Sequence, residues 1–420
     1  MSEPQHNDTD YAFSAVPASE RKGFWSMLLI LLGFTFFSAS MWTGAELAAG
    51  LNLNGFLLAV AIGGAILGAY TGALGYIGAK TGLNFDLLCH RAFGPKGSYL
   101  PSAMISLTQI GWTGVGFAMF AYPIQQKFLP GAGPAALWGM VIAIGVATTL
   151  STYYGVKGLE IVSWISVPLI TVLGCYAMGK SIIDGGGMQA IFSKSAGNLS
   201  LLAAVGMVIG SFVSGGTATP NFVRFARPNA AIWTTVIAFF LGNTLMFFFG
   251  GVAGAFTGEK DIFFVMAAMG LMIPAILVLG ANIWTTNDVA LYTGSLGLSN
   301  LTKAPKRPMV LVAGALATVF ALWLYNHFCD WLTILNATLP PVGAILVLDY
   351  FRHKDRYAAD GSAGRQVNWG SVVGVIGGAT AGNLVHWGIP AITAMGIAAV
   401  CYLVTDILVP ARTSCGSSGK

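Results

Sequence analysis

Glycine and hydroxyl residues interrupt a long apolar run in Gly33-Phe-Thr-Phe-Phe-Ser-Ala-Ser-Met-Trp-Thr-Gly44, and again in Gly210-Ser-Phe-Val-Ser-Gly-Gly-Thr-Ala-Thr-Pro220. In lipid, a helix that unwinds within such a run frees carbonyl and N–H groups, which a solute, an ion or a neighbouring helix must satisfy. Freed carbonyls suit a cation. Glycine and serine also let helices pack closely, so each stretch has two interpretations, and the matched placement of the two favours a binding site.

The composition around these stretches is that of a membrane protein. Of the 420 residues, 55% are hydrophobic and 9% are charged, whereas soluble domains carry about 25% charged residues. Because a membrane-spanning helix needs about 20 apolar residues, the sequence predicts an all-α membrane protein with about twelve transmembrane helices. The predicted spans lie near residues 24–50, 54–79, 98–126, 134–152, 158–179, 200–223, 231–256, 263–297, 308–327, 331–350, 368–386 and 388–409.

Positive charge is distributed unevenly between the predicted loops. When the loops are numbered alternately from a cytoplasmic start, 17 of the 21 Lys and Arg residues fall on the starting side and 4 on the other. Lys and Arg in short loops stay cytoplasmic, so we expect both termini inside the cell, and residues 1–20 lack the pattern of a signal peptide. The five cysteines are scattered without metal or disulfide spacing. Topology explains the net charge of +5, and no nucleic-acid partner is expected.

The two interrupted stretches fall in the first and sixth predicted spans, which are corresponding positions if spans 1–5 and 6–10 are two halves. Matched interruptions of this kind are typical of inverted-repeat transporters, with the site at the unwound helices. This organisation predicts a cytoplasmic tail at 1–23, a first repeat at 24–179 and a second repeat at 180–351. Two further spans with their preceding cytoplasmic loop would occupy 352–410, and a tail would occupy 411–420.

The third span offers a binding face for a planar solute. Gln109 and Trp112 are three residues apart and share one face of a helix. An amide supplies a donor and an acceptor together, which matches the edge of a nucleobase, and aromatic rings stack on bases. In the sixth span, Phe212 could supply the opposite ring face, with Ser211 and Ser214 as hydrogen-bonding groups. A tryptophan in a membrane helix also serves packing or interfacial anchoring.

The eighth span contains the densest polar cluster inside any span. Asn282, Thr285 and Thr286 share one helix face, and neutral oxygen donors suit a monovalent cation such as Na⁺. The threonines could instead bond back to carbonyls of their own helix. Asp288 is an ionisable group at or near membrane depth, which makes it a functional hypothesis: it is either a proton carrier or a hydrogen-bond acceptor that orients the helix.

Several of these segments closely resemble the cytosine permeases of the nucleobase-cation-symport-1 family. The resemblance runs through all the spans and weakens in the tails and at loops 185–199 and 303–308. The matching segments are the first interrupted stretch quoted above, Gly75-Tyr-Ile-Gly-Ala-Lys-Thr-Gly-Leu83, Asn282-Ile-Trp-Thr-Thr-Asn-Asp288 and Ala321-Leu-Trp-Leu-Tyr-Asn326.

This resemblance implies the leucine-transporter-type fold, with 5+5 inverted repeats, broken first and sixth spans and two additional C-terminal helices. The implied nucleobase ligands are Gln109, Trp112, Ser211, Phe212, Ser214 and Asn282. The implied Na⁺ ligands are carbonyls near Gly33, Phe36 or Phe37, with Asn282, Thr285 and Thr286.

The resemblance therefore predicts a secondary active transporter that imports cytosine across the bacterial inner (plasma) membrane by Na⁺-coupled symport with alternating access. Its partners would be cytosine and the lipid bilayer, and we expect a monomer with no obligate protein partner. The alternatives are a proton-coupled nucleobase permease and a transporter of the same fold for another small solute. A channel would favour a continuous polar lining. An enzyme is not expected, because no span holds a nucleophile–base pair or a metal-ligand motif such as His-Glu-x-x-His.

Overall fold

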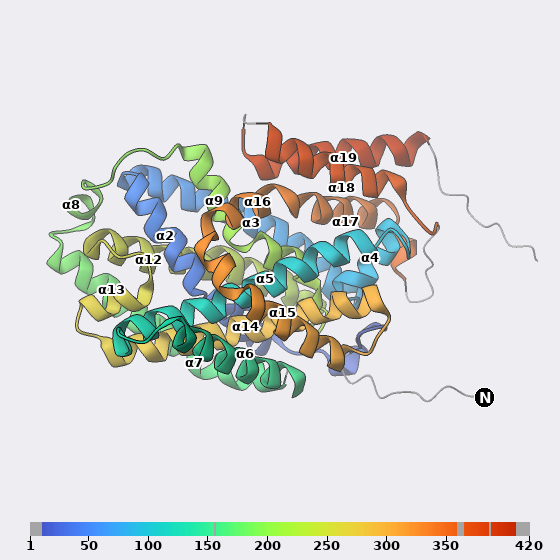
Figure 1. Ribbon diagram of the computed structural model, residues 1–420. Coiled ribbons are helices and arrows are strands. Elements are labelled where there is room, and N and C mark those ends of the chain that lie inside the picture. The colour runs from blue at the N-terminus through green and yellow to red at the C-terminus, as the bar shows by residue number, and fades with distance from the viewer. Residues whose placement is uncertain (1–10, 155–156, 359–364, 386–387, 409–420) are drawn as a thin grey trace, which may run out of the picture.

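The computed structural model describes residues 11–154, 157–358, 365–385 and 388–408, and within these ranges it contains helices and no β-strand. The long helices lie side by side and run broadly along one direction (Figure 1). The prediction of an all-α protein is confirmed.

The helices follow the predicted spans in order. In the range predicted for the first repeat, they are α1 (Phe24–Thr35), α2 (Ser38–Gly50), α3 (Leu53–Thr81), α4 (Phe85–Phe93), α5 (Tyr99–Phe128), α6 (Pro134–Tyr154) and α7 (Lys157–Asp184). In the range predicted for the second repeat, they are α8 (Met188–Phe192), α9 (Leu201–Thr217), α10 (Pro220–Val223), α11 (Pro228–Val236), α12 (Asn243–Thr257), α13 (Ile262–Ala268), α14 (Met272–Thr302), α15 (Lys306–Asn326), α16 (Phe328–Thr338) and α17 (Pro340–Arg352). Helices α18 (Trp369–Leu384) and α19 (Pro390–Leu408) complete the order.

Apolar length supports a membrane location. Among the described residues, nine helices are long and apolar enough to cross a membrane, or ten if the bent pair α1 and α2 forms one span. Two helices at predicted spans are not among these nine. They are α14, in the predicted eighth span, which carries the polar cluster, and α18, in the predicted eleventh span, which has 16 residues. The count of twelve spans stays a prediction.

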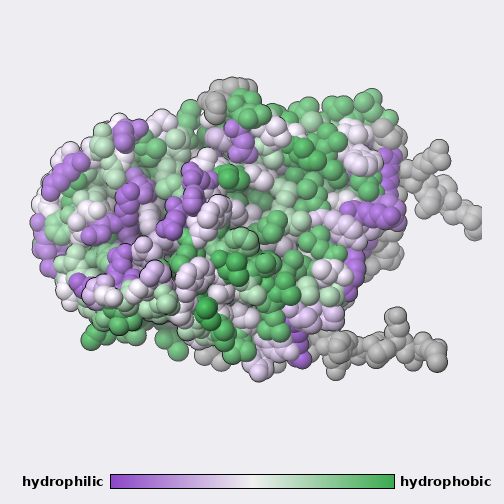
Figure 2. Space-filling model, viewed as in Figure 1, coloured by the Kyte–Doolittle hydropathy of each residue, from purple (hydrophilic) through white to green (hydrophobic). Residues whose placement is uncertain are grey.

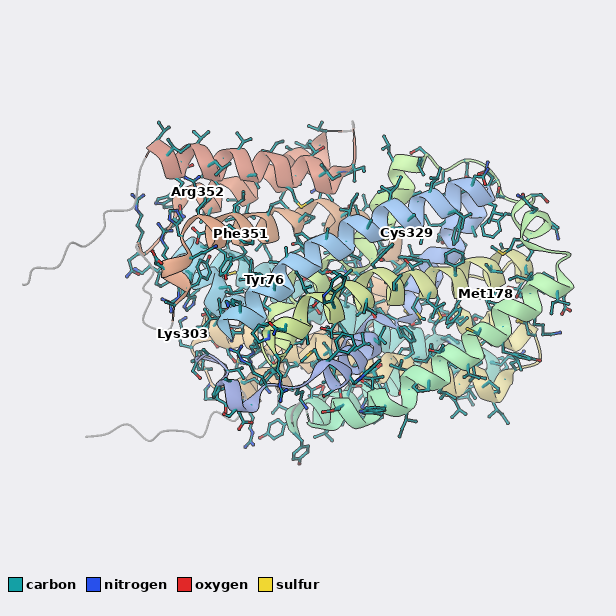
Figure 3. All side chains as sticks on the ribbon, turned by 180° about the vertical axis from the view of Figure 1, so that it is seen from behind. Tyr76, Met178, Lys303, Cys329, Phe351 and Arg352 are labelled. Carbon is teal, nitrogen blue, oxygen red and sulfur yellow. The ribbon has the colours of Figure 1, made fainter. Side chains whose placement is uncertain are left out.

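The surface agrees with this membrane location. Hydrophobic side chains cover much of the middle of the visible face, and hydrophilic ones gather toward its two ends (Figure 2). Seen from behind, Lys303 and Arg352 lie toward one end, whereas Met178 and Cys329 lie toward the other (Figure 3). Lys303 and Arg352 are both among the residues that the charge pattern predicts to be cytoplasmic.

The first and sixth spans differ from each other. Helices α1 and α2 meet at a bend of 55°, as the first interrupted stretch predicts. The sixth span runs from Leu201 to Val223 without such a bend, and α9 stays helical through Thr217. The prediction of an unwound sixth span is therefore wrong for Gly210–Thr217, and the helical hydrogen bonding is disturbed only around Ala218 and Thr219.

Close packing explains why the glycines of α9 do not unwind it. A Cβ atom on Gly210 would lie 2.9 Å from the backbone oxygen of Leu332 in α16. A Cβ on Gly215 would lie 2.8 Å from the ring of Phe34, and one on Gly216 would lie 2.6 Å from the side chain of Thr71 in α3. These glycines let neighbouring helices approach closely, which is the packing interpretation of the stretch.

Candidate functional site

The backbone between α1 and α2 leaves the helical conformation at two residues. Phe36 has φ −77° and ψ 77°, and Phe37 is extended with φ −121° and ψ 136°. The N–H group of Phe37 donates to the carbonyl two residues earlier at 2.9 Å, and that of Ser38 donates to Oδ1 of Asn282 at 2.7 Å. Neither N–H group reaches the carbonyl four residues back, as it would in a continuous helix. The carbonyls of Gly33 and Phe34 therefore need other donors.

Helix α14 supplies those donors through its two threonines. Oγ1 of Thr285 donates to the carbonyl of Gly33 at 2.9 Å, and Oγ1 of Thr286 lies 3.3 Å from the carbonyl of Phe34. Oγ1 of Thr285 also lies 3.1 Å from the carbonyl of Ala281, in its own helix. The threonine face of α14 thus meets the interrupted backbone, although one hydroxyl is shared with its own helix.

Asn282 meets the same interruption one turn earlier on α14. Its Nδ2 donates to the carbonyl of Phe36 at 2.5 Å, while its Oδ1 accepts from Ser38. The carbonyl of Phe37 instead accepts from the N–H of Ser40 at 3.0 Å, at the start of α2. The structure therefore brings Gly33 and Phe36 to α14 together with the carbonyl of Phe34, whereas the carbonyl of Phe37 lies outside these contacts.

The resulting cluster has the donor chemistry of a Na⁺ site. It gathers backbone carbonyls, two hydroxyls and an amide oxygen, and no carboxylate belongs to it. The side chains of Asn282, Thr285 and Thr286 are all at least 97% buried. Buried neutral oxygens fit a monovalent cation better than a divalent one, which usually recruits carboxylates. The residues therefore fit Na⁺, which would exchange the hydrogen bonds within the cluster for bonds to the ion.

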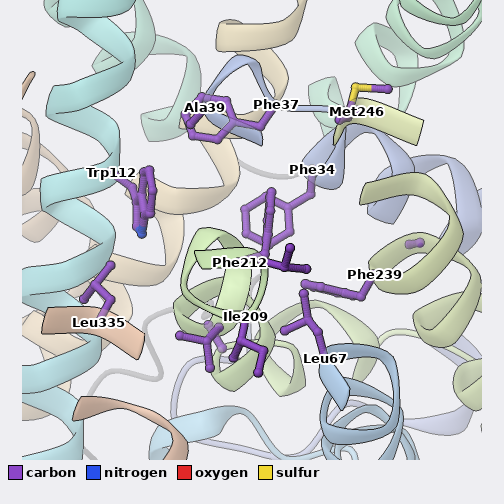
Figure 4. Packing of buried hydrophobic residues seen from close by; sticks show 14 of the residues in the cluster. Phe34, Phe37, Ala39, Leu67, Trp112, Ile209, Phe212, Phe239, Met246 and Leu335 are labelled. Carbon is purple, nitrogen blue, oxygen red and sulfur yellow. The ribbon is translucent and has the colours of Figure 1, made fainter. Parts of the chain in front are cut away.

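A narrow cavity of about 10 Å³ lies beside this cluster. Its walls come from α1, α5, α9 and α14, and from Phe37 in the break between α1 and α2. Figure 4 shows Trp112 on α5 across from Phe34 and Phe212. The lining residues are Phe34, Phe37, Gln109, Trp112, Ser211, Phe212, Ser214, Gly215, Thr286 and Ala290.

Gln109 gives this cavity an unmet hydrogen-bonding requirement. The side chain is 1% exposed, and its Nε2 has no hydrogen-bond partner among the described residues. Leaving a buried donor unsatisfied costs about 1–3 kcal/mol. A buried amide that lines a cavity and has a free donor is suited to solute binding, because a solute can supply the missing acceptor.

Aromatic rings form the walls on both sides of the cavity. The ring of Phe37 lies 5.8 Å from that of Trp112 and 6.5 Å from that of Phe212, edge-on to both. Phe212 also meets Phe34 edge-on at 5.2 Å. Phe37 thus connects the two aromatic walls, and a planar solute would find ring faces on α5 and α9.

The structure separates the predicted ligands into two groups. Gln109, Trp112, Ser211, Phe212 and Ser214 line the cavity together. Asn282, predicted for both sites, does not line the cavity and contacts the α1 break instead.

Thr286 belongs to both groups, because it lines the cavity and reaches the carbonyl of Phe34. The sequence analysis named the carbonyl of Phe37 as a cation ligand, but it did not predict that the Phe37 ring would form part of the cavity wall. The two consecutive phenylalanines at the break were the available signal.

Asp288 faces away from the cavity, toward α6. Its carboxylate accepts from Oγ of Ser151 at 2.5 Å and from Oγ1 of Thr152 at 3.0 Å. The indole Nε1 of Trp284 in turn donates to Ser151 at 3.3 Å. These contacts fit the interpretation of Asp288 as an acceptor that orients α14 against α6.

Comparisons with known proteins place this chain in a family. A family model described as a permease for cytosine/purines, uracil, thiamine and allantoin matches residues 15–405. The cytosine permease of Escherichia coli (strain K12) is 43% identical over 413 residues, covering 97% of this chain and 96% of that protein. The hydantoin permease of Microbacterium maritypicum is 20% identical and covers 65% of this chain and 61% of its own length.

Solved structures share the fold. Mhp1, a nucleobase-cation-symport-1 family transporter in a closed conformation with bromovinylhydantoin bound, matches with a TM-score of 0.78 at 18% identity, over 96% of each chain. A Na⁺-coupled sialic acid symporter in a substrate-bound outward-open state matches with a TM-score of 0.72 at 14% identity, over 97% of this chain and 93% of that one. The chain is therefore an integral membrane protein that belongs to the cytosine permease family of nucleobase-cation-symport-1 transporters.

Proposed function

We propose that this protein imports cytosine across the bacterial inner membrane by Na⁺ symport with alternating access, with both termini in the cytoplasm. The observation that carries the proposal is the free amide of Gln109 between two aromatic walls in a buried cavity. A planar ring with hydrogen-bonding edges satisfies the amide and stacks on the walls, with stacking worth about 1–3 kcal/mol per base. The 43% identical relatives named cytosine permease select cytosine among such rings.

Ion coupling follows from two neighbouring residues at the break. The carbonyl of Phe36 contacts Asn282 in the cation cluster, and the ring of Phe37 closes the cavity between its aromatic walls. An ion that holds the Phe36 carbonyl against α14 would therefore also fix the ring of Phe37. Thr286 supports the same connection, because it belongs to both the cluster and the cavity lining.

The coupling must be reciprocal. If Na⁺ raises the affinity for cytosine, cytosine raises the affinity for Na⁺ by the same factor. Neither ligand needs to touch the other, because both act on the same few residues between α1 and α2. Alternating access would then require the bundle to change between forms that open the cavity to either side.

Uptake into proteoliposomes tests the proposal. Purified protein is reconstituted, and labelled cytosine uptake is measured with and without an inward Na⁺ gradient at equal pH on both sides. We expect the gradient to drive accumulation, and excess unlabelled cytosine to abolish the signal.

Two results would overturn the proposal. Accumulation driven by a pH gradient and indifferent to Na⁺ would replace Na⁺ with a proton as the coupling ion. Uptake of another small solute without uptake of cytosine would show that the protein transports that solute instead.

A further inference from the structure

The seventh span contains an unusual turn beside the cavity. Between α11 and α12, residues Ile237–Gly242 form a π-helix. Such turns are rare, and they occur frequently at functional sites. A Cβ on Gly242 would lie 3.0 Å from Oγ1 of Thr35, at the end of α1, and the ring of Phe239 packs 5.7 Å from that of Phe212. The π-helix thus lies directly behind the cavity wall.

The residue that follows this turn is Asn243, the first residue of α12. Its side chain is 1% exposed, and its Oδ1 has no hydrogen-bond partner in the part of the chain that the structure describes. Its Nδ2 lies 3.5 Å from Oγ of Ser211, which lines the cavity. Asn243 is therefore a buried amide one layer behind the candidate substrate site, at the long end of hydrogen-bond distance from a lining hydroxyl.

This contact, together with the bond that Ser211 donates to Val208, limits what the hydroxyl of Ser211 offers to a solute. A hydroxyl has one proton and two lone pairs. Ser211 donates its proton to the carbonyl of Val208 at 2.8 Å, and Nδ2 of Asn243 is directed at one lone pair. The other lone pair remains for the cavity. If the amide is rotated by 180°, the proton of Ser211 gains a second acceptor in Asn243 and is still held away from the solute.

We propose that Asn243 is a positioning residue that keeps Ser211 a hydrogen-bond acceptor and thereby favours pyrimidines with an exocyclic amino group over their oxo counterparts. An amino group donates to the free lone pair of Ser211. A carbonyl oxygen at the same place meets a lone pair. To donate to it, Ser211 must turn its proton away from Val208, which also moves the accepting lone pair away from Nδ2 of Asn243. The inference rests on the proposed function, because it assumes that the cavity binds a pyrimidine.

The test is a competition experiment on the full-length protein in nanodiscs at saturating Na⁺. Binding of labelled cytosine is displaced by unlabelled cytosine or by uracil, for wild type, Asn243→Leu, Ser211→Ala and the double variant. We expect Asn243→Leu to reduce the preference for cytosine over uracil about fivefold, the worth of one ordinary hydrogen bond. In the Ser211→Ala background, Asn243→Leu should change the preference no further, since the two residues act as a unit.

Thr244→Val is the matched control. Thr244 follows Asn243 directly, and its Oγ1 is likewise buried without a partner among the described residues. Unlike Nδ2 of Asn243, which lies near Ser211, this atom lies near Gly64 of α3. The control should leave the cytosine preference unchanged. If Asn243→Leu does not fold, Asn243→Ser removes the same contact and carries the same expectation.

The outcomes separate the inference from the proposed function. Equal loss of cytosine and uracil binding in Asn243→Leu, or an equal change of preference in Thr244→Val, would reduce Asn243 to a structural residue and overturn the inference alone. A wild-type protein that binds neither base would overturn the proposed function and the inference with it.

Discussion

The α1–α2 junction and helix α9 have similar compositions and different structures. Both segments concentrate glycine, serine and threonine inside an apolar run. The first bends by 55° and exposes backbone carbonyls to α14, whereas the second remains helical from Leu201 to Thr217. The density of small residues therefore does not by itself determine where a membrane helix unwinds.

The neighbouring helices account for the difference. Opposite the α1–α2 junction, α14 presents an amide and two hydroxyls that satisfy the freed carbonyls. Opposite Gly210, Gly215 and Gly216 in α9, the closest groups are a backbone oxygen, an aromatic ring and a threonine methyl. Because an unsatisfied backbone group in the membrane costs several kcal/mol, the backbone can open at the α1–α2 junction, where hydrogen-bond donors of α14 satisfy the freed carbonyls.

The largest expected effect is on the junction itself. Replacing Thr285 and Thr286 together by valine leaves the carbonyls of Gly33 and Phe34 without these donors and removes two candidate cation ligands. We expect the Na⁺ concentration for half-maximal cytosine binding to rise about 100-fold, from two hydrogen bonds of about 1.4 kcal/mol each. Cytosine binding titrated against Na⁺ measures this.

Thr293→Val is the control for the threonine pair. Thr293 lies on the same helix, is fully buried, and its Oγ1 has no partner among the described residues. This variant should keep the wild-type Na⁺ dependence. An unchanged Na⁺ dependence in the double valine variant would show that α14 does not hold the coupling ion.

The packing role of the α9 glycines is open to a direct test. In Gly210→Ala, the new Cβ would lie 2.9 Å from the backbone oxygen of Leu332, which cannot move aside without shifting α16. Overpacking of this kind should destabilise the protein by about 2 kcal/mol, visible as a lower melting temperature.

Gly280→Ala on α14 is the comparison for Gly210. There the nearest atom, on the ring of Phe120, would lie 3.5 Å away, which is ordinary contact, so stability should be retained. A Gly210→Ala protein as stable as wild type would contradict the packing explanation for the helical α9.

A substitution in the cavity should change the affinity for cytosine, whereas a substitution at the junction should change the Na⁺ dependence. Gln109→Leu keeps the volume and removes the free amide, so cytosine affinity at saturating Na⁺ should fall about tenfold, while the Na⁺ dependence stays as in wild type. Equilibrium binding measures both.

Gln125→Leu is a suitable control for Gln109, because Gln125 lies near the end of the same helix and bonds to the carbonyl of Ala132. It should bind cytosine as wild type does. If Gln109→Leu mainly altered the Na⁺ dependence, the separation of cavity and cation cluster would be wrong.

The smallest effect is expected at Asp288. Asn can accept from one of the two hydroxyls, Ser151 or Thr152, through its Oδ1 and donate to the other through its Nδ2, so Asp288→Asn should change Na⁺-driven uptake by less than about threefold. Uptake in proteoliposomes at several pH values checks this. Abolished uptake would instead favour Asp288 as a proton carrier.

The sequence allowed most of the fold to be predicted, because apolar run length and the resemblance are properties of long segments. It also allowed the cavity residues Gln109, Trp112 and Phe212 to be named, since helical spacing places side chains on a face. It could not separate the helical α9 from the broken first span, because that depends on which side chains of α3, α14 and α16 lie opposite. For the same reason the carbonyl of Phe34 was missed and that of Phe37 was named.

We propose that Na⁺ and cytosine act on one shared element, the break between α1 and α2. This proposal is tested most directly by measuring the cytosine dissociation constant of the purified protein over a wide range of Na⁺ concentration at constant ionic strength. We expect the dissociation constant to fall as Na⁺ rises and then to level off. A cytosine dissociation constant that is the same at every Na⁺ concentration would contradict it.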